Sequence, residues 1–272
     1  MTNVGVVVPC FDAGAVLREA IDSVRAQEHP GIRIVVCDDG STDPETLDIL
    51  HSLESEGLKV LRQENAGPGA ARNTAIRYID AEYILPLDAD DRLLPRAVSA
   101  CADVLDARPE IGIVAGASEL IGEAEGHVRC TYTGIESMLD ETTIPNISMF
   151  RRTDWEAVGG YPENIRTGED WGFWMRVLGL GREVEVLDRA LFEYRISENQ
   201  VTRRLDTVDV ARARNVVMRD ARDLYARHPD YLIEQLAQQR ELLAHFRKRY
   251  GPIQERAARL KGLLARIRSR LG

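Results

Sequence analysis

The first 115 residues alternate short apolar runs with amphipathic stretches. The apolar runs lie at residues 4–8, 32–37, 59–62, 83–87 and 111–115. Between them, apolar residues recur at helical spacing at 15–27, 44–56, 68–79 and 95–107. Three of these stretches begin with a proline, which is favoured in the first turn of a helix. Buried strands that alternate with helices predict the α/β class, with a mostly parallel twisted sheet flanked by helices.

The pattern is less regular between residues 116 and 202. A turn between two strands is expected at Gly122–Gly126, and an extended segment at Glu183–Ile196. A short helix is expected at Asp154–Val158, ending at a pair of glycines, and a longer one at Asp170–Leu178.

The chain changes character after about residue 201 and becomes rich in Arg, Leu and Ala. Gly251 and Pro252 are expected to break or kink the predicted helix. Its apolar residues are spaced alternately three and four apart, as in a heptad seam, at Leu243, Phe246, Tyr250, Ile253, Ala257, Leu260, Leu264, Ile267 and Leu271.

Composition and charge narrow the class of protein. The 272 residues are 44% hydrophobic and 29% charged, as is usual for a soluble globular chain, and no run is apolar enough to span a membrane. Its start predicts a core strand rather than a signal peptide, so a cytoplasmic location is expected. The four cysteines show no metal-binding spacing. The net charge of −9 argues against nucleic acid as a partner.

That charge is unevenly distributed along the chain. From residue 206 onward there are 15 basic and 8 acidic residues, against 20 basic and 36 acidic residues before it. Between Arg247 and Arg270 there are nine basic residues and one acidic residue. A basic helix with one apolar stripe suits an anionic membrane surface, but it also suits packing on the acidic remainder or pairing with a second copy.

Polar residues gather where the predicted parallel strands end. The carboxyl ends of such strands meet at one edge of the sheet, where α/β proteins bind their ligands. Crowded carboxylates repel one another, so a divalent cation or a hydrogen-bond donor is expected there. The residues beyond the first four strands include Asp12, Asp38, Asp39, Asn65, Gly67, Asp88 and Asp90.

Asp88 and Asp90 form a D-x-D pair after the fourth strand. Residues two apart on an extended chain project to the same side, and two hard oxygen ligands suit Mn²⁺ or Mg²⁺. The alternative is that Asp90 or Asp91 caps the helix near Pro95. Asp39 could accept a bond from an imide N–H or a ribose hydroxyl, or simply belong to a turn.

Two further motifs admit more than one interpretation. Gly67–Arg72 opens a helix and suits an anion or a nucleotide, but it lacks the third glycine of a dinucleotide-binding fingerprint. Glu169 and Asp170 precede an amphipathic helix, either as its cap or as a general base. Trp171 and Trp174, three apart, are typical of a core, although a Trp at a cleft rim can also stack on sugar rings.

Taken together, these motifs resemble the family 2 glycosyltransferases of the GT-A fold. The resemblance covers residues 3–202 and rests on seven segments in family order: VVVPCFD, VVCDDGSTD, RQENAGPGAARN, YILPLDADD, MFRRTDWEAVGGYPE, TGEDWGFWMR and EYRISENQVT. It implies a catalytic domain at 1–202, with a nucleotide-binding half at 1–116 and an acceptor half at 117–202. A helical extension would follow at 203–272.

The resemblance also implies roles for individual residues. Asp170 would be the catalytic base, Asp88 and Asp90 would hold Mn²⁺ or Mg²⁺, and Trp171 would face the acceptor. The nucleotide-sugar donor would be bound by Pro9, Phe11, Asp12, Asp39, Asn65, Gly67, Arg72, Asp88 and Glu169.

Two positions depart from the family pattern. Asp12 stands where the first motif usually ends in Asn. Ser197 stands where the family often has a His near the metal or diphosphate, which leaves one protein ligand fewer. A Q-x-x-R-W motif of processive synthases is also absent from the sequence, which favours a single addition.

The sequence therefore predicts an inverting, metal-dependent glycosyltransferase that moves a sugar from a nucleotide-sugar, by resemblance a UDP-sugar, to the hydroxyl of a sugar or glycolipid acceptor. The alternatives are a sugar-phosphate nucleotidyltransferase and a non-catalytic homologue that binds nucleotide-sugars. The helical extension would form a homodimer or touch the inner face of the membrane.

Overall fold

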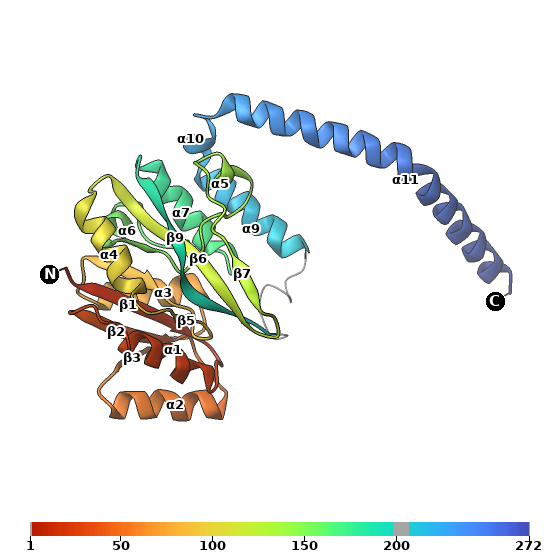
Figure 1. The fold of residues 1–272 in the computed structure, drawn as a ribbon. Coiled ribbons are helices and arrows are strands. Elements are labelled where there is room, and N and C mark those ends of the chain that lie inside the picture. The colour runs from red at the N-terminus through yellow and green to blue at the C-terminus, as the bar shows by residue number, and fades with distance from the viewer. Residues whose placement is uncertain (1, 198–206, 272) are drawn as a thin grey trace. The chain divides into compact units, whose positions relative to one another are not determined.

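The computed structural model describes residues 2–197 and 207–271, with side chains at 2–197 and 208–250. Its strands join into one mixed, mostly parallel sheet in the order β3-β2-β1-β4-β8-β6-β9-β5, with β7 beside β6 (Figure 1). The strands are β1 (Val4–Cys10), β2 (Ile32–Asp38), β3 (Lys59–Arg62), β4 (Tyr83–Pro86), β5 (Arg92–Leu93), β6 (Ile111–Gly122), β7 (Gly126–Val128), β8 (Met149–Arg151) and β9 (Glu183–Ile196).

Helices cover both faces of this sheet. α1, α2 and α4 pack on one face, and α3, α6 and α7 lie on the other. The helices are α1 (Val16–Arg25), α2 (Pro44–Ser55), α3 (Pro68–Tyr78), α4 (Ala97–Ala107), α5 (Ser137–Asp140), α6 (Arg152–Val158), α7 (Glu169–Gly179), α9 (Thr207–Asp220), α10 (Arg222–Tyr225) and α11 (Pro229–Leu271).

The predicted succession of strands and helices is confirmed through the first 115 residues. The Asp43 carboxylate caps α2 by accepting from the Thr46 N–H at 2.8 Å, and Pro44 follows in the first turn. The helix expected from Pro95 instead begins at Ala97, because Arg96 has a left-handed backbone (φ 63°). This geometry excludes Asp90 and Asp91 as caps of α4.

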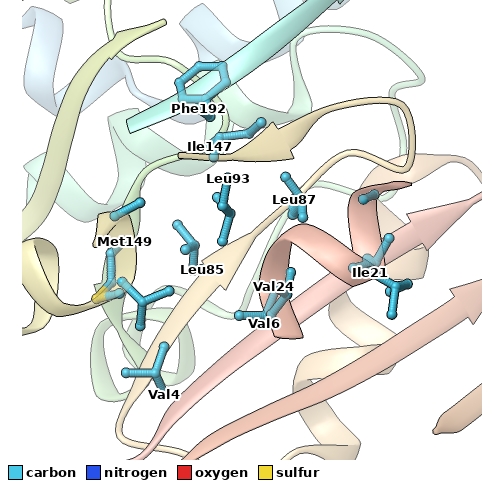
Figure 2. Packing of buried hydrophobic residues seen from close by; sticks show 14 of the residues in the cluster. Val4, Val6, Ile21, Val24, Leu85, Leu87, Leu93, Ile147, Met149 and Phe192 are labelled. Atoms are coloured by element: carbon cyan, nitrogen blue, oxygen red, sulfur yellow. The ribbon is translucent and has the colours of Figure 1, made fainter. Parts of the chain in front are cut away.

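Alternate residues of β1 face the two halves of the core. Val4, Val6 and Val8 pack with the helices of one face, and Figure 2 shows Val4 and Val6 in the same cluster as Leu85 and Leu87 of the β4 region. Burial on both faces explains the continuous apolar runs in the sequence.

An aromatic cluster supports α7 on the opposite face. The Phe173 ring stacks on Tyr161 at 4.2 Å and meets Phe150 edge-on at 4.8 Å. Trp174, one residue later, is fully buried against Phe150. The interpretation of Trp174 as a core residue is therefore confirmed, and the cluster fixes the helix that begins with Glu169 and Asp170.

The chain separates into two compact units, Met1–Leu224 and Tyr225–Gly272. α9 belongs to the first unit, since Val217 is buried and the Arg176 guanidinium of α7 pairs with Asp220 at 2.8 Å. The expected domain boundary near residue 202 lies outside the described residues and stays a prediction.

The second unit contains α11, a single helix of 43 residues. It continues across Gly251 and Pro252, so the predicted break is wrong, while the alternative of a kink at this point stays a prediction. The heptad positions beyond Tyr250 lie outside the residues whose side chains are described. Across the described part of the chain, no helix combines the length and the apolar character needed to cross a bilayer.

Candidate active site

The Asp39 carboxylate organises the loop that follows β3. Its Oδ1 accepts from the Gln63 Nε2 at 2.7 Å and from the Ala66 N–H at 2.9 Å, and its Oδ2 accepts from the Gly67 N–H at 2.8 Å. Gly67 has a φ of 93°, a conformation that favours glycine. Asp39 is thus a buried anchor of this loop, and any contact with a nucleoside would be additional.

Asp12 has a similar anchoring role at the end of β1. Its Oδ1 accepts from the N–H groups of Thr42 at 2.7 Å and Asp43 at 2.9 Å. It holds a left-handed backbone (φ 46°), which Asp tolerates better than most residues. The preceding Phe11 ring is 51% exposed, and Pro9 is half-buried within β1. Phe11 therefore offers an open aromatic face beside the loop that Asp12 holds.

Asn65 bridges the loop after β3 to the segment before α7. Its Oδ1 accepts from the Arg166 Nη1 at 2.9 Å. Neither Arg166 nor Gln63 stands out in the sequence, because each acts through a partner that is distant in the chain. The contact between Asn65 and Arg166 joins the predicted nucleotide half to the predicted acceptor half.

Arg72 lies buried between the D-x-D pair and α7. One guanidinium nitrogen donates to Asp88 Oδ1 and the other to Glu169 Oε1, both at 2.7 Å. The guanidinium also lies 5.5 Å from the centre of the Tyr161 ring. Arg72 thus brings together Asp88 and Glu169, as expected of residues in one site.

Asp88 is held from its other side by Asn146. The Asn146 Nδ2 lies 3.0 and 3.1 Å from the two oxygens of that carboxylate. Asn146 was also missed, because the segment before β8 has no pattern that would point to it. With Arg72 and Asn146 in place, the Asp88 carboxylate has a fixed orientation.

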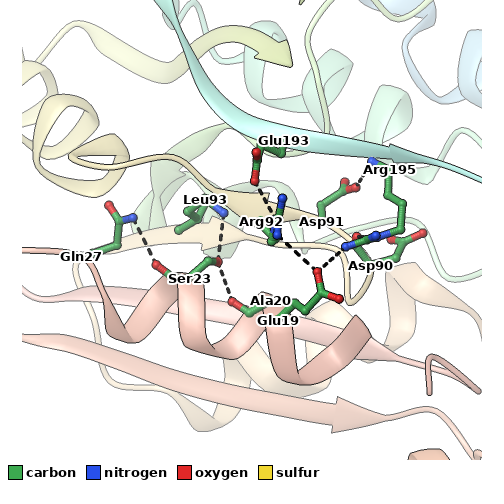
Figure 3. Close-up of polar contacts among 10 residues, drawn as sticks. All are labelled: Glu19, Ala20, Ser23, Gln27, Asp90, Asp91, Arg92, Leu93, Glu193 and Arg195. Carbon is green, nitrogen blue, oxygen red and sulfur yellow. Dashed lines mark hydrogen bonds and ion pairs between the residues drawn. The ribbon is translucent and has the colours of Figure 1, made fainter. Parts of the chain in front are cut away.

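Asp90 and Asp91 differ in their surroundings. Burial and the negative charge of Asp88 raise the pKa of Asp90 to about 6. Asp91 is more deeply buried, and its Oδ1 accepts from the backbone N–H of Arg195 at 2.8 Å. Figure 3 shows Asp91 and Asp90 beside Arg195, which β9 contributes.

Glu169 and Asp170 form the first turn of α7, after a left-handed Gly168. The cap position therefore belongs to Gly168 and not to either acid. Burial, and then the negative charge of Glu169, raise the pKa of Asp170 above its ordinary value; Arg72 opposes this rise and Asp88 adds to it. A carboxylate with a raised pKa is a stronger base than an exposed one.

Trp171 does not present an open face for stacking. Its ring is buried, and its Nε1 donates to the Met138 carbonyl at 2.7 Å. This indole therefore fastens the segment around α5 to α7. The expectation that Trp171 contacts the acceptor is corrected accordingly: its position in the helix turns the ring into the interior.

The Asp88 and Asp90 pair fits a divalent cation that takes part of its ligand sphere from water or a substrate. Both residues offer hard oxygen ligands, and the raised pKa of Asp90 reflects first its burial and then its repulsion by Asp88, which a cation would relieve. Among the described residues, no group of three or more His, Cys, Asp or Glu side chains forms a complete metal site. The pair is therefore an incomplete ligand set.

Comparison with known proteins places these observations in a family. Residues 5–156 match the family described as Glycosyl transferase family 2, which is more than half of the chain. The chondroitin synthase of Escherichia coli is 27% identical over 184 residues, or 65% of this chain and 27% of that protein. The putative teichuronic acid biosynthesis glycosyltransferase TuaG of Bacillus subtilis is 28% identical over 213 residues, or 74% of this chain and 84% of that protein.

Solved structures agree on the fold. S. aureus TarS 1-349 in complex with UDP-GlcNAc has a TM-score of 0.68 at 21% identity, over 80% of this chain and 66% of that one. The mannosyltransferase PcManGT from Pyrobaculum calidifontis, in complex with GDP-Man and Mn²⁺, has a TM-score of 0.57 at 20% identity, over 73% and 58%. The GT-A fold expected from the sequence motifs is confirmed.

The match spans only part of several relatives, covering 27%, 22% and 19% of three of them. The assignment of the family does not depend on those partial matches, because the family match itself covers this chain from β1 to α6. The chain belongs to glycosyl transferase family 2.

Proposed function

We propose that this protein is an inverting glycosyltransferase that moves one sugar from a nucleotide-sugar, by preference a UDP-sugar, to an acceptor hydroxyl. The observation that carries the proposal is the Arg72 bridge, which holds Asp88 of the D-x-D pair and Glu169 beside Asp170 within one buried network. Family membership supports it, as do the similar solved structures in complex with UDP-GlcNAc and with GDP-Man.

Asp170 is the proposed base of the transfer. Its carboxylate takes the proton of the acceptor hydroxyl while the oxygen attacks the anomeric carbon from the side opposite the nucleotide. The bond from that carbon to the diphosphate oxygen breaks, and the nucleoside diphosphate leaves with the electron pair. A single displacement inverts the anomeric centre and needs one base. Asp170 suits this role, because its burial and the negative charge of Glu169 raise its pKa.

The donor site is proposed at the carboxyl ends of β1 to β4. Phe11 offers its exposed ring to the nucleobase, and Asp39 and Asp12 shape the loops around it. Arg72 orients Asp88 and Glu169. The proposed donor-binding set is Pro9, Phe11, Asp12, Asp39, Asn65, Gly67, Arg72, Asp88 and Glu169.

Asp88 and Asp90 are proposed to hold Mn²⁺ or Mg²⁺. When bound, such an ion would neutralise the charge that develops on the departing diphosphate. Ser197, in place of the family's frequent His, leaves the remaining ligand positions to water and diphosphate oxygens. Asn146 and Arg72 keep the Asp88 carboxylate oriented for this purpose.

The acceptor is proposed to be a sugar or glycolipid in the synthesis of a polysaccharide or glycoconjugate. Support comes from relatives whose names include chondroitin synthase and a teichuronic acid biosynthesis glycosyltransferase. A single addition is proposed because the sequence lacks the Q-x-x-R-W motif.

α11 is proposed as an association element for a second copy of this chain or for an anionic membrane. Leu236, Leu243, Phe246 and Tyr250 share one face of this helix at spacings of three, four and seven. The sequence between Arg247 and Arg270 adds nine basic residues and one acidic residue. A seam of this kind can pack against a second copy of the chain or against a membrane. Light scattering tests for self-association, and vesicle flotation tests for membrane binding.

The function is tested by screening nucleotide-sugars with Mn²⁺ for a rise in thermal stability, followed by detection of the released nucleotide and the glycosylated product. A stabilising donor, with turnover, is the expected result. Asp90→Ala should remove the Mn²⁺-dependent part of the stabilisation, whereas Asp80→Ala, at an exposed surface acid, should leave it intact. Donor binding without turnover for any acceptor would instead identify a non-catalytic homologue.

A further inference from the structure

Arg195 fastens the end of β9 to the loop that carries the D-x-D pair. Its backbone N–H donates to the Asp91 Oδ1 at 2.8 Å, and its Nε donates to the backbone carbonyl of Asp90, also at 2.8 Å (Figure 3). One residue of β9 therefore holds two consecutive residues of the loop, from a distance of more than 100 positions in the sequence.

The same guanidinium reaches a third element. Its Nη2 donates to the Glu19 Oε2 of α1 at 2.6 Å. A planar guanidinium presents its donors in a fixed fork, so bonding through Nε and Nη2 together fixes the orientation of the whole group. The Asp90 carbonyl is thus set against two rigid elements, α1 and β9.

The adjacent acids Asp90 and Asp91 have separate roles in this arrangement. Asp91 is directed inward and uses one oxygen to accept the N–H of β9. Because the peptide group is planar, fixing the carbonyl of Asp90 limits the directions that the neighbouring residues can take. The segment from Asp88 to Asp91 is a turn rather than the expected extended chain, since the Asp91 N–H donates to the Asp88 carbonyl at 3.1 Å, and within this turn the Asp90 carboxylate lies near enough to Asp88 to be affected by its charge.

We propose that Arg195 is a positioning residue for the cation site, which sets the Asp90 carboxylate beside Asp88 by holding the Asp90 carbonyl against β9 and α1. This inference rests on the proposed function, since it requires Asp88 and Asp90 to bind the cation. Arg195 acts through the loop backbone and is not itself a ligand.

Arg92 provides a matched control in the same network. Its Nε donates to Glu193 Oε2 at 2.7 Å, and its Nη1 lies 3.4 Å from the Glu19 carboxylate. It therefore joins the same strand and the same helix as Arg195, but its side chain bonds these two glutamates and not the Asp90 carbonyl. A general loosening of the network would follow from changing either arginine, whereas a change in loop position would follow from Arg195 alone.

The test measures Mn²⁺ binding to the full chain in the presence of UDP by titration calorimetry. Arg195→Gln and Arg195→Lys should each raise the Kd of Mn²⁺ at least tenfold, because neither side chain can hold the Asp90 carbonyl and Glu19 in the same geometry. Arg92→Lys should change that Kd less than twofold. In turnover assays, the KM for Mn²⁺ should rise with Arg195→Lys while kcat at saturating Mn²⁺ changes less than threefold.

A wild-type Kd for Mn²⁺ in Arg195→Lys would overturn the inference, and so would equal effects of Arg195→Lys and Arg92→Lys. Either result leaves the proposed function standing, provided that Asp90→Ala abolishes Mn²⁺ binding. A wild-type chain that binds no Mn²⁺ with UDP would overturn both. Arg195→Lys keeps the positive charge next to Glu19, so it carries the test if Arg195→Gln fails to fold.

Discussion

Arg72 and Glu169, 97 residues apart in the sequence, form a buried ion pair of 2.7 Å between α3 and α7. The side chains are 4% and 9% exposed, so each charge depends on the other for its solvation. Since Arg72 also holds Asp88, the position of the D-x-D pair and the position of the helix with Asp170 are linked through one guanidinium.

Removing this guanidinium should destabilise the protein strongly. Arg72→Gln leaves the Glu169 carboxylate buried without its charge partner and should lower the free energy of unfolding by about 3–5 kcal/mol. Arg77→Gln is the control on the same helix, where the partner is the exposed Glu163, and should cost less than about 1 kcal/mol. Urea denaturation measures both. Similar losses of unfolding free energy in the two variants would show that the buried ion pair of Arg72 does not stabilise the fold more than an exposed pair does.

The Asp39 anchor should affect donor binding more than chemistry. Asp39→Asn places an amide NH₂ where a carboxylate oxygen now accepts from Ala66 or Gly67. Loss of one charge-assisted hydrogen bond, about 1.5 kcal/mol, should raise the KM for the donor about tenfold, with a smaller change in kcat. Asp43→Asn should leave both unchanged, because Asn also caps helices well. A large fall in kcat with an unchanged KM would contradict this role.

The rate of transfer should depend on the protonation of Asp170. Burial and the charge of Glu169 raise the pKa of Asp170. As the pH falls, Asp170 should therefore become protonated, and kcat/KM should decrease, at a higher pH than for an ordinary carboxylate. Glu169→Gln removes the neighbouring negative charge and should move this acidic limb of the profile to lower pH. An unchanged limb in this variant, or a limb near pH 4 in the wild-type protein, would assign the titration to another group.

The apolar face of α11 should mediate association. If the wild-type chain self-associates in light scattering, Leu243→Glu should weaken that association. If the wild-type chain instead floats with vesicles that contain anionic lipid, Leu243→Glu should weaken the flotation. Ala244→Glu introduces the same charge at the neighbouring position, away from that face, and should have little effect. A wild-type chain that stays monomeric and does not float at low salt would exclude both partners.

The alternating sheet and helices were predictable because each element leaves a local pattern. The apolar run at residues 4–8 and the proline that opens the stretch at 44–56 are examples, and both elements are confirmed. The short strands β5 and β8 were not predicted, since two or three residues carry too little periodicity. The break expected at Pro252 was wrong because one missing hydrogen bond does not end a long helix rich in Ala, Leu and Arg.

The residues of the candidate site likewise fall into those that the sequence could predict and those that it could not. Asp88, Asp90 and Asp170 could be proposed from the sequence because they lie at strand and helix ends within recognisable motifs. Gln63, Asn146 and Arg166 could not, because each is defined by a contact with a residue far along the chain. The burial of Trp171 agrees with the interpretation of Trp171 and Trp174 as a core pair, whereas its expected contact with the acceptor came from the family resemblance.

Turnover by Asp170→Asn, beside the wild-type protein, tests the central claim most directly. With the donor and acceptor identified by the screen, kcat should fall by about 10²–10⁴-fold while the Kd of the donor stays within twofold, because the base acts on the acceptor. Inverted configuration at the anomeric carbon should accompany wild-type turnover. Wild-type kcat in Asp170→Asn, or a loss of donor binding that matches the loss of rate, would contradict the assignment of Asp170 as the base.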